Sequence, residues 1–188
     1  MTFVSATFPT PDGPFSIIAC DDAVLASGWT ADTAELLALI HPDLRPEPGA
    51  VVRFGFDDAS GALAEVGGGA DAATEMLAKA VAAVHAYYEG DHRAIDAVPV
   101  RQTSGPYREH AWDVLRAVEP GQAITYTHFA ERTGRPAATR AAAGACAMNA
   151  AALFVPCHRV LRSDGTLGGF RYGLPIKNAL LLRESVEA

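Results

Sequence analysis

Short apolar, β-prone runs fill the first part of the chain. They lie at 3–8, 15–20, 24–29 and 51–56. Turn-forming residues separate the first three runs, with Pro11-Asp12-Gly13-Pro14 after the first and Asp21-Asp22 after the second. Runs of this length between turn signals are typical of strands, so we expect a small antiparallel sheet.

A different spacing follows these runs. Residues 31–40 are expected to form a helix, whereas 41–50, with three prolines and a glycine, and the run Gly67-Gly68-Gly69 predict loops. After the N-cap candidate Asp71, apolar residues recur every three or four positions until Gly90. This pattern predicts a longer helix between Asp71 and Gly90.

The second half of the chain is predicted to be mainly helical. A first helix covers 107–118 and ends at Glu119-Pro120-Gly121. A short helix over 127–133 ends at Gly134, and another begins at Pro136 and runs to about residue 147. Two helices joined by a short turn that contains glycine are a helix-turn-helix candidate.

The balance of charge changes near residue 100. Residues 1–100 hold 4 Lys/Arg against 15 Asp/Glu, a formal charge of −11, whereas residues 101–188 hold 11 against 7, a formal charge of +4. An acidic scaffold joined to a polyanion-binding domain has this asymmetry, and ordinary scatter of surface charge is the alternative. We therefore expect an α+β protein with domains at 1–100 and 101–188, connected through residues 91–105.

Membrane-spanning and disulfide-stabilised classes do not fit the composition. No apolar run is long enough to span a bilayer, and no basic flank leads into an apolar segment at the N-terminus. Cys20, Cys146 and Cys157 are an odd number of cysteines without the spacing of a disulfide framework. We expect a cytoplasmic protein with reduced thiols, each of which is by default a small buried apolar residue.

The predicted helix after Pro136 has an unusual composition. Alanine and glycine dominate it, and Arg140 is the one long side chain between Pro136 and Cys146. A tightly packed core helix is the ordinary explanation. A smooth helix with one protruding arginine also suits a DNA groove, where the arginine inserts into the base stack.

A cysteine and a histidine follow an apolar stretch at 150–155. A cysteine attacks as the thiolate, and its ordinary pKa of about 8.5 leaves it mostly protonated at neutral pH. Cys157 is followed by His158 and Arg159, and Glu184 lies in a helix expected over 177–186. Because neighbouring side chains diverge on an extended strand, contact between Cys157 and His158 needs a bend or a bridging water.

The segment Pro156-Cys157-His158-Arg159-Val160 resembles the active-site signature of the O6-alkylguanine-DNA alkyltransferases, also called methylated-DNA-protein-cysteine methyltransferases. This pentapeptide is highly specific to that family, and the resemblance covers nearly the whole chain, most strongly from Gly121 to Glu184. The other matching residues are Ile124-Thr125-Tyr126, Arg140, Asn149, the run at 165–173, Lys177, Leu180-Leu181-Leu182, Pro11-Asp12-Gly13-Pro14 and Ala86-Tyr87-Tyr88-Glu89-Gly90.

Two segments depart from the family's pattern. The run at 169–173 is most similar to the bacterial adaptive-response branch, where Gly-Tyr-Arg-Trp-Gly stands, so Phe170 lacks a phenolic hydroxyl here. Ahead of Trp112, a common Gly-Thr-x-Phe-Gln run is replaced by Ser104-Gly105-Pro106-Tyr107-Arg108. DNA contacts from the first helix of the C-terminal domain are therefore not carried over.

The resemblance implies a fold and an activity. The fold is a ribonuclease H-like N-terminal lobe with a small antiparallel sheet, followed by a helical domain with a helix-turn-helix. The activity is DNA repair by direct reversal: a methyl or alkyl group moves irreversibly, once per molecule, from O6-alkylguanine in double-stranded DNA to Cys157. The damaged base is flipped out of the helix first. O4-alkylthymine is left open as a second substrate.

The resemblance also implies roles for single residues. Cys157 is the nucleophile, and His158 deprotonates it through a water while Glu184 orients the imidazole. Tyr126 helps to rotate the nucleotide and donates a proton to the base. Asn149 holds a turn before the active-site strand. The further residues are Arg140, Thr127, Ala141 and Gly144 on the DNA, and Val160, Phe170, Arg171 and Lys177 around the substrate.

Few other components are expected. The implied chemistry needs no cofactor, and Cys20 with His41 does not make a four-ligand zinc set, so no metal site is expected. The expected partner is alkylated double-stranded DNA and not a membrane. A monomer is the family default, and cooperative binding along DNA is left open.

Two other classes of protein are the alternatives. The non-catalytic alkyltransferase-like proteins bind lesions and summon other repair, but they replace the reactive cysteine, usually by tryptophan, whereas Cys157 is present. A Cys/His hydrolase or a thiol redox protein needs an oxyanion hole or a resolving cysteine, and the sequence does not place Cys146 as one.

Overall fold

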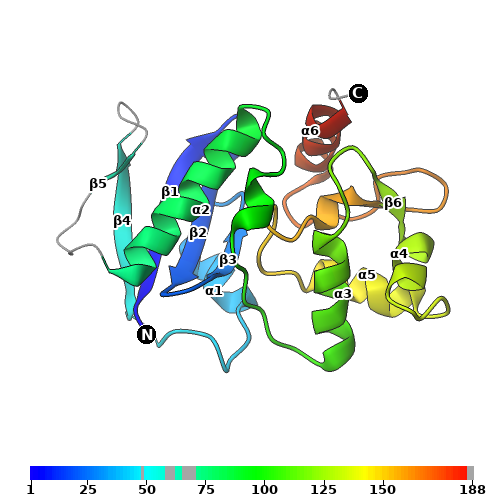
Figure 1. Cartoon of the computed structure of the whole chain (residues 1–188), viewed down its shortest axis with the longest axis horizontal. Coiled ribbons are helices and arrows are strands. Elements are labelled where there is room, and N and C mark those ends of the chain that lie inside the picture. The colour runs from blue at the N-terminus through cyan, green and yellow to red at the C-terminus, as the bar shows by residue number, and fades with distance from the viewer. Residues whose placement is uncertain (48, 58–61, 65–70, 186–188) are drawn as a thin grey trace.

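The computed structural model describes residues 1–47, 49–57, 62–64 and 71–185. Within these residues a sheet lobe precedes a mainly helical C-terminal part (Figure 1). The predicted loop at Gly67-Gly68-Gly69 lies outside the described residues. None of the described helices is long and apolar enough to cross a membrane.

The sheet has five strands in the order β3-β2-β1-β4-β5. Their bounds are Phe3–Thr10 (β1), Gly13–Cys20 (β2), Val24–Gly28 (β3), Val51–Asp57 (β4) and Ala62–Ala64 (β5). The first three strands pair antiparallel, as expected. β4 instead pairs parallel with β1, so the sheet is mixed. The long connection from β3 through a helix allows this, because parallel neighbours need a crossover rather than a hairpin.

Two helices cover the sheet. Helix α2, Ala72–Tyr88, packs on β1 and β2, and Asp71 caps it by accepting a hydrogen bond from the Thr74 N–H. Helix α1, Thr33–Leu39, packs on β2 and β3 and is capped by Asp32. Alternate residues of β2 belong to two separate hydrophobic clusters, with Ile17 in the cluster of α2 and Ile18 in that of α1. The two helices therefore lie on opposite faces of the sheet.

The C-terminal part consists of short helices around a two-stranded parallel sheet. The helices are Pro106–Arg116 (α3), Tyr126–Arg132 (α4), Thr139–Ala147 (α5) and Leu174–Ser185 (α6), and the strands are Ile124–Thr125 (β6) and Val160–Leu161 (β7). Two 3₁₀ turns complete it, Ala94–Ala97 (η1) in the connection and Cys157–Arg159 (η2). α4 and α5 pack on each other as the predicted helix-turn-helix pair.

Two helix starts differ most from the sequence prediction, and Cys157 lies in a different kind of element. α5 begins at Thr139 rather than Pro136. After α4, Gly134 adopts the left-handed conformation with φ 73°, and the Arg135 N–H donates to the Ala130 carbonyl. The chain then needs one more turn before α5. Helix α6 begins earlier than expected, since a proline is tolerated in the first turn. Cys157 lies in η2 and not on an extended strand.

The two parts of the molecule share one hydrophobic cluster. It includes Val24 and Trp29 from the sheet lobe and Phe129 and Val160 from the C-terminal part. β3 also bonds to the segment after α5: the Ser27 N–H donates to the Ala150 carbonyl over 2.9 Å, and the Ala152 N–H donates to the Ser27 carbonyl over 3.1 Å. The division at residue 100 stays a prediction.

Candidate active site

Cys157 lies at the wall of a pocket of about 460 Å³. The pocket is lined by Tyr126 of α4, by α5, by the segment that leads from Asn149 to Cys157, and by the loop over 169–172. The Cys157 side chain is 9% exposed. The Cys157 N–H donates to the Val155 carbonyl over 2.8 Å, so the backbone makes a tight turn just before the cysteine that lines the pocket. Cys157 is therefore nearly enclosed but faces a cavity large enough for a small group, and Cys146 of α5 lines the same cavity.

Asn149 contacts this thiol directly. Its Nδ2 donates to the Val155 carbonyl over 2.8 Å and to Cys157 Sγ over 3.3 Å, and its Oδ1 accepts from the Ala151 N–H over 3.1 Å. The side chain thus bonds to the local backbone, as predicted, and also donates to sulfur. A hydrogen bond of this kind favours the thiolate over the thiol.

Opposing effects act on the acidity of Cys157. Burial raises the pKa of the thiol, while the hydrogen bond from Asn149 and the positive charges of Lys177 and Arg171 act to lower it. Burial is the larger effect, so the pKa is above its ordinary value and the resting group is a neutral thiol. Nucleophilic attack from this pocket therefore requires a base.

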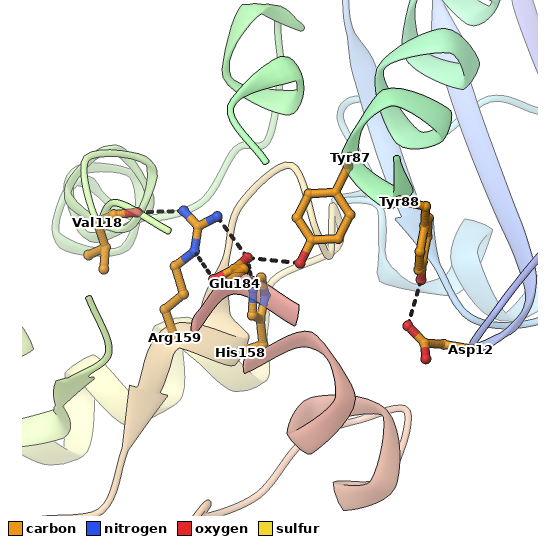
Figure 2. Close-up of polar contacts among 7 residues, drawn as sticks. All are labelled: Asp12, Tyr87, Tyr88, Val118, His158, Arg159 and Glu184. Atoms are coloured by element: carbon orange, nitrogen blue, oxygen red, sulfur yellow. Dashed lines mark hydrogen bonds and ion pairs between the residues drawn. The ribbon is translucent and has the colours of Figure 1, made fainter. Parts of the chain in front are cut away.

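His158 and Glu184 form a buried pair (Figure 2). His158 Nε2 lies 2.8 Å from Glu184 Oε1. Burial works to raise the pKa of Glu184, but the contacts with His158 and Arg159 outweigh it and hold that pKa well below its usual range. Burial lowers the pKa of His158, and this effect is larger than the opposing effect of the Glu184 carboxylate, which raises it. The pair is therefore a carboxylate and a neutral imidazole.

This state fixes the tautomer of His158. A carboxylate only accepts hydrogen bonds, so the imidazole carries its proton on Nε2 and Nδ1 has a free lone pair. Nδ1 is buried and has no hydrogen-bond partner among the described residues. No direct hydrogen bond joins His158 to Cys157 within the described part of the chain.

Two further residues hold Glu184, and sequence reasoning did not assign them. Arg159 is 1% exposed, and its Nε and Nη2 each donate to the carboxylate over 2.9 Å, while Nη1 donates to the Val118 carbonyl. Tyr87 of α2 donates its hydroxyl to Glu184 Oε1 over 2.8 Å. The position of Arg159 inside the signature was a usable signal. For Tyr87 the sequence offers no signal beyond its place in a matching segment, because it lies 97 positions before Glu184.

Tyr126 stands on another wall of the pocket, in the first turn of α4. The Thr125 side chain caps that helix by accepting from the His128 N–H over 3.1 Å. Burial raises the pKa of Tyr126 to about 12. Its hydroxyl therefore keeps its proton at neutral pH and can donate it.

The structure separates the expected substrate residues into two groups. Phe170 and Arg171 line the pocket. The Val160 side chain is instead buried in the hydrophobic cluster, and Lys177 Nζ donates to the Val160 carbonyl over 2.6 Å and to the Leu167 carbonyl. These two residues lie behind the pocket wall, where Lys177 ties α6 to β7 and supplies positive charge.

The expected DNA-contacting residues lie mostly in solvent. Arg140 and Ala141 on α5 and Thr127 on α4 are exposed, and Gly144 is half-buried. The next turns of α5 contribute Ala143 and Ala147 to the pocket. One short helix therefore carries the exposed arginine and part of the reaction pocket. Among the described residues there is no cluster of three or more His, Cys, Asp or Glu that could hold a metal ion.

The sheet lobe supports the loop that lines the pocket. The Trp29 ring lies 6.0 Å from the Phe170 ring and 5.6 Å from the Tyr172 ring, centroid to centroid. The Tyr172 hydroxyl donates to the Ser27 carbonyl over 3.2 Å. A Cβ atom on Gly28 would lie 2.0 Å from that hydroxyl oxygen, so glycine leaves the space that the Tyr172 ring occupies.

Replacing Gly28 with alanine is expected to destabilise the protein by about 1–3 kcal/mol, the usual cost of overpacking. The new methyl group would expel the Tyr172 ring and break its bond to Ser27. The free energy of unfolding, measured in urea, checks this. In a Tyr172→Ala background the same change should cost much less. Equal costs in both backgrounds would show that Tyr172 is not the residue displaced.

Known proteins match this chain in sequence and in fold. Residues 106–186 match the family described as 6-O-methylguanine DNA methyltransferase, DNA binding domain. The bifunctional transcriptional activator/DNA repair enzyme Ada of Escherichia coli K12 is 44% identical over 79 residues, 42% of this chain and 22% of that protein. The methylated-DNA–protein-cysteine methyltransferase of Rattus norvegicus is 32% identical over 133 residues, 66% of this chain and 63% of that protein. The chain thus spans less than two thirds of either relative.

A solved structure extends the likeness to the whole fold. The crystal structure of Mycobacterium tuberculosis OGT in complex with DNA superimposes with a TM-score of 0.70, over 98% of this chain and 94% of that one, at 22% identity. At this identity the likeness concerns the fold. Residues 106–186 of this chain therefore match a DNA-binding domain of the 6-O-methylguanine DNA methyltransferase family, in agreement with the resemblance of its signature segment.

Proposed function

We propose that this chain repairs alkylated DNA by direct reversal, moving one alkyl group from O6-alkylguanine to its own Cys157. The observation that carries the proposal is the thiol itself. It is nearly enclosed at a pocket, it accepts a hydrogen bond from Asn149, and a neutral histidine with a free Nδ1 is its neighbour. Double-stranded DNA is the proposed partner, since residues 106–186 match a DNA-binding domain.

The proposed reaction balances as a displacement. The thiol proton passes through a water to His158 Nδ1, and the Nε2 proton stays on the hydrogen bond to Glu184. The sulfur forms a bond to the alkyl carbon as the bond from that carbon to O6 breaks. Tyr126 donates its proton to the leaving guanine, and the proton held by His158 returns to Tyr126 through solvent. The products are guanine and a thioether on Cys157.

The DNA must deliver the base to this pocket. An alkyl group on O6 cannot reach an enclosed sulfur while the base is stacked, so the nucleotide is flipped out of the duplex. Exposed Arg140 on α5 is proposed to fill the space that the base leaves, with Ala141, Gly144 and Thr127 against the groove. Phe170 and Arg171 then line the alkyl pocket. In this proposal residues 101–188 carry the chemistry and residues 1–100 support it.

A non-reacting lesion binder is the second candidate. Such a protein would need the surface that flips the base but no residue that accepts the alkyl group. Cys157 lines the pocket and accepts a hydrogen bond from Asn149, which favours a protein that takes up the alkyl group. Cys20, Cys146 and Cys157 are free thiols, which suits a reducing compartment, so we propose the cytoplasm as the location.

Mass measurement tests the proposal. On incubation with a duplex that contains O6-methylguanine, the protein should gain the mass of one methylene group, on the peptide that contains Cys157. Repair should stop after one lesion per molecule, because a thioether is not reversed by water or thiols. Undamaged duplex of the same sequence is the control. Binding without a change in mass would favour the lesion binder, and repair beyond one equivalent would contradict a single-use acceptor.

A further inference from the structure

Gln102 lies in the connection before the matched domain, and it contacts the active-site asparagine. Its Nε2 donates to Asn149 Oδ1 over 3.0 Å, and its Oε1 accepts from the Ala150 N–H over 2.7 Å. Gln102 does not line the reaction pocket. Its contact with the thiol therefore runs through Asn149.

Backbone donors fix the orientation of both amide side chains. The Ala150 N–H can only donate, so Gln102 must present its oxygen there and its NH₂ group to Asn149. The Ala151 N–H also only donates, so Asn149 presents its oxygen to Ala151 and Gln102. The NH₂ group of Asn149 is then left for the Val155 carbonyl and Cys157 Sγ. A rotated Asn149 amide would leave two donors facing each other.

The backbone beside Gln102 is itself held in place. The Arg101 N–H donates to the Val24 carbonyl over 2.9 Å, and the Val24 N–H donates to the Pro99 carbonyl over 2.9 Å. The Arg101 side chain is also paired with Asp22. β3 and the turn before it thus fix the position of the backbone that carries the Gln102 side chain.

We propose that Gln102 is a positioning residue for alkyl transfer, which holds the Asn149 amide so that its N–H points at Cys157 Sγ. The role in transfer rests on the proposed function, whereas the effect on the thiol does not. A donor aimed at sulfur favours the thiolate, and each unit by which the pKa of a thiol rises lowers its thiolate fraction about tenfold below that pKa. Without Gln102 the Asn149 oxygen keeps only its bond from the Ala151 N–H, so the amide is held less firmly in the orientation that aims its N–H at sulfur.

Two variants of Gln102 and a matched control test this inference. Gln102→Leu removes both hydrogen bonds. Gln102→Glu keeps the shape and the acceptor for Ala150 but places a carboxylate oxygen against Asn149 Oδ1. Gln122→Leu makes the same chemical change at an exposed glutamine, whose backbone N–H bonds to Glu119. If Gln102→Leu does not fold, Gln102→Met, which is close to glutamine in shape and adds no charge, takes its place.

The readout is the pH profile of the reaction between Cys157 and iodoacetamide, followed by peptide mass so that Cys20 and Cys146 are counted separately. The midpoint should rise by about one pH unit in both Gln102 variants and stay in place in Gln122→Leu. The plateau rate at high pH should change little. Transfer from O6-methylguanine duplex at neutral pH should slow about tenfold and recover as the pH rises.

The outcomes separate this inference from the proposed function. Profiles that superimpose on that of the wild-type protein would overturn the role of Gln102, even if methyl transfer is observed. A shifted profile in a protein that never accepts a methyl group from DNA would support the role of Gln102 and contradict the proposed function. A loss of rate that higher pH does not restore would indicate a general disturbance of the fold and would count against positioning.

Discussion

Replacing Cys157 with serine is expected to abolish methyl transfer from O6-methylguanine DNA while the fold is retained. A hydroxyl ionises far less readily than a thiol and is a weak nucleophile without strong activation. Loss of the nucleophile lowers the rates of other enzymes by on the order of 10⁶-fold, and a similar loss is expected here. Transfer of a radiolabelled methyl group under single-turnover conditions measures it.

A second cysteine variant provides the control for this result. Cys20 is buried in the sheet lobe, where its thiol lies 3.3 Å from Asp22 Oδ1, and Cys20→Ser should transfer the methyl group at the wild-type rate. Residual labelling of Cys157→Ser would argue against Cys157 as the acceptor. Label on the peptide of Cys146, which also lines the pocket, would place the acceptor there.

Replacing Glu184 with glutamine is expected to lower the free energy of unfolding by about 3–5 kcal/mol, the usual cost of removing one partner from a buried ion pair. The guanidinium of Arg159 would remain 1% exposed with no countercharge. Methyl transfer should slow as well, because the neutral amide no longer fixes the Nε2 proton of His158. Urea unfolding at neutral pH, followed by tryptophan fluorescence, measures the first effect.

The pH dependence of unfolding gives a second signature of Glu184. Its folded-state pKa lies below the unfolded value of about 4.3, so its stabilising effect is complete above that pH. The effect is lost as the pH falls through the folded pKa. The stability of Glu184→Gln should therefore vary less in acid than that of the wild-type protein.

Tyr87→Phe is the matched control for the charge cluster. It removes one hydrogen bond from the same carboxylate but leaves the charges paired, so a loss of only about 0.5–1.5 kcal/mol is expected. A similar cost for the two variants would mean that charge pairing is not what Glu184 contributes. An unchanged stability of Glu184→Gln would contradict the whole account of the cluster.

Local signals in the sequence predicted most of the secondary structure. Asp71 and Gly90 mark the ends of α2 because a cap and a stop act within one helical turn. The parallel pairing of β4 with β1 had no such signal, since strand direction depends on contacts distant in sequence. The start of α5 was wrong for a related reason: the way α4 ends consumes three further residues.

The site also contains residues that the sequence identified and contacts that it did not predict. The signature identifies Cys157 and its neighbours, and the structure does bring Glu184 and Asn149 to them. Which way each side chain points depends on the turn at η2, so the sequence did not separate Phe170, at the pocket, from Lys177, behind its wall. Gln102 and Tyr87 reach the site across 47 and 97 positions of sequence, and no local pattern encodes such contacts.

The pairing of β3 with the C-terminal part has a consequence for aggregation. β3 is the outermost strand on its side of the sheet, and unpaired outer strands recruit other chains. Here Val24 is bonded to the segment that leads to Gln102, and Ser27 to the segment that leads to Cys157. The polypeptide that builds the thiol pocket therefore also shields the β3 edge of the sheet from intermolecular pairing. A fragment that ends at residue 100 would expose part of that strand and self-associate.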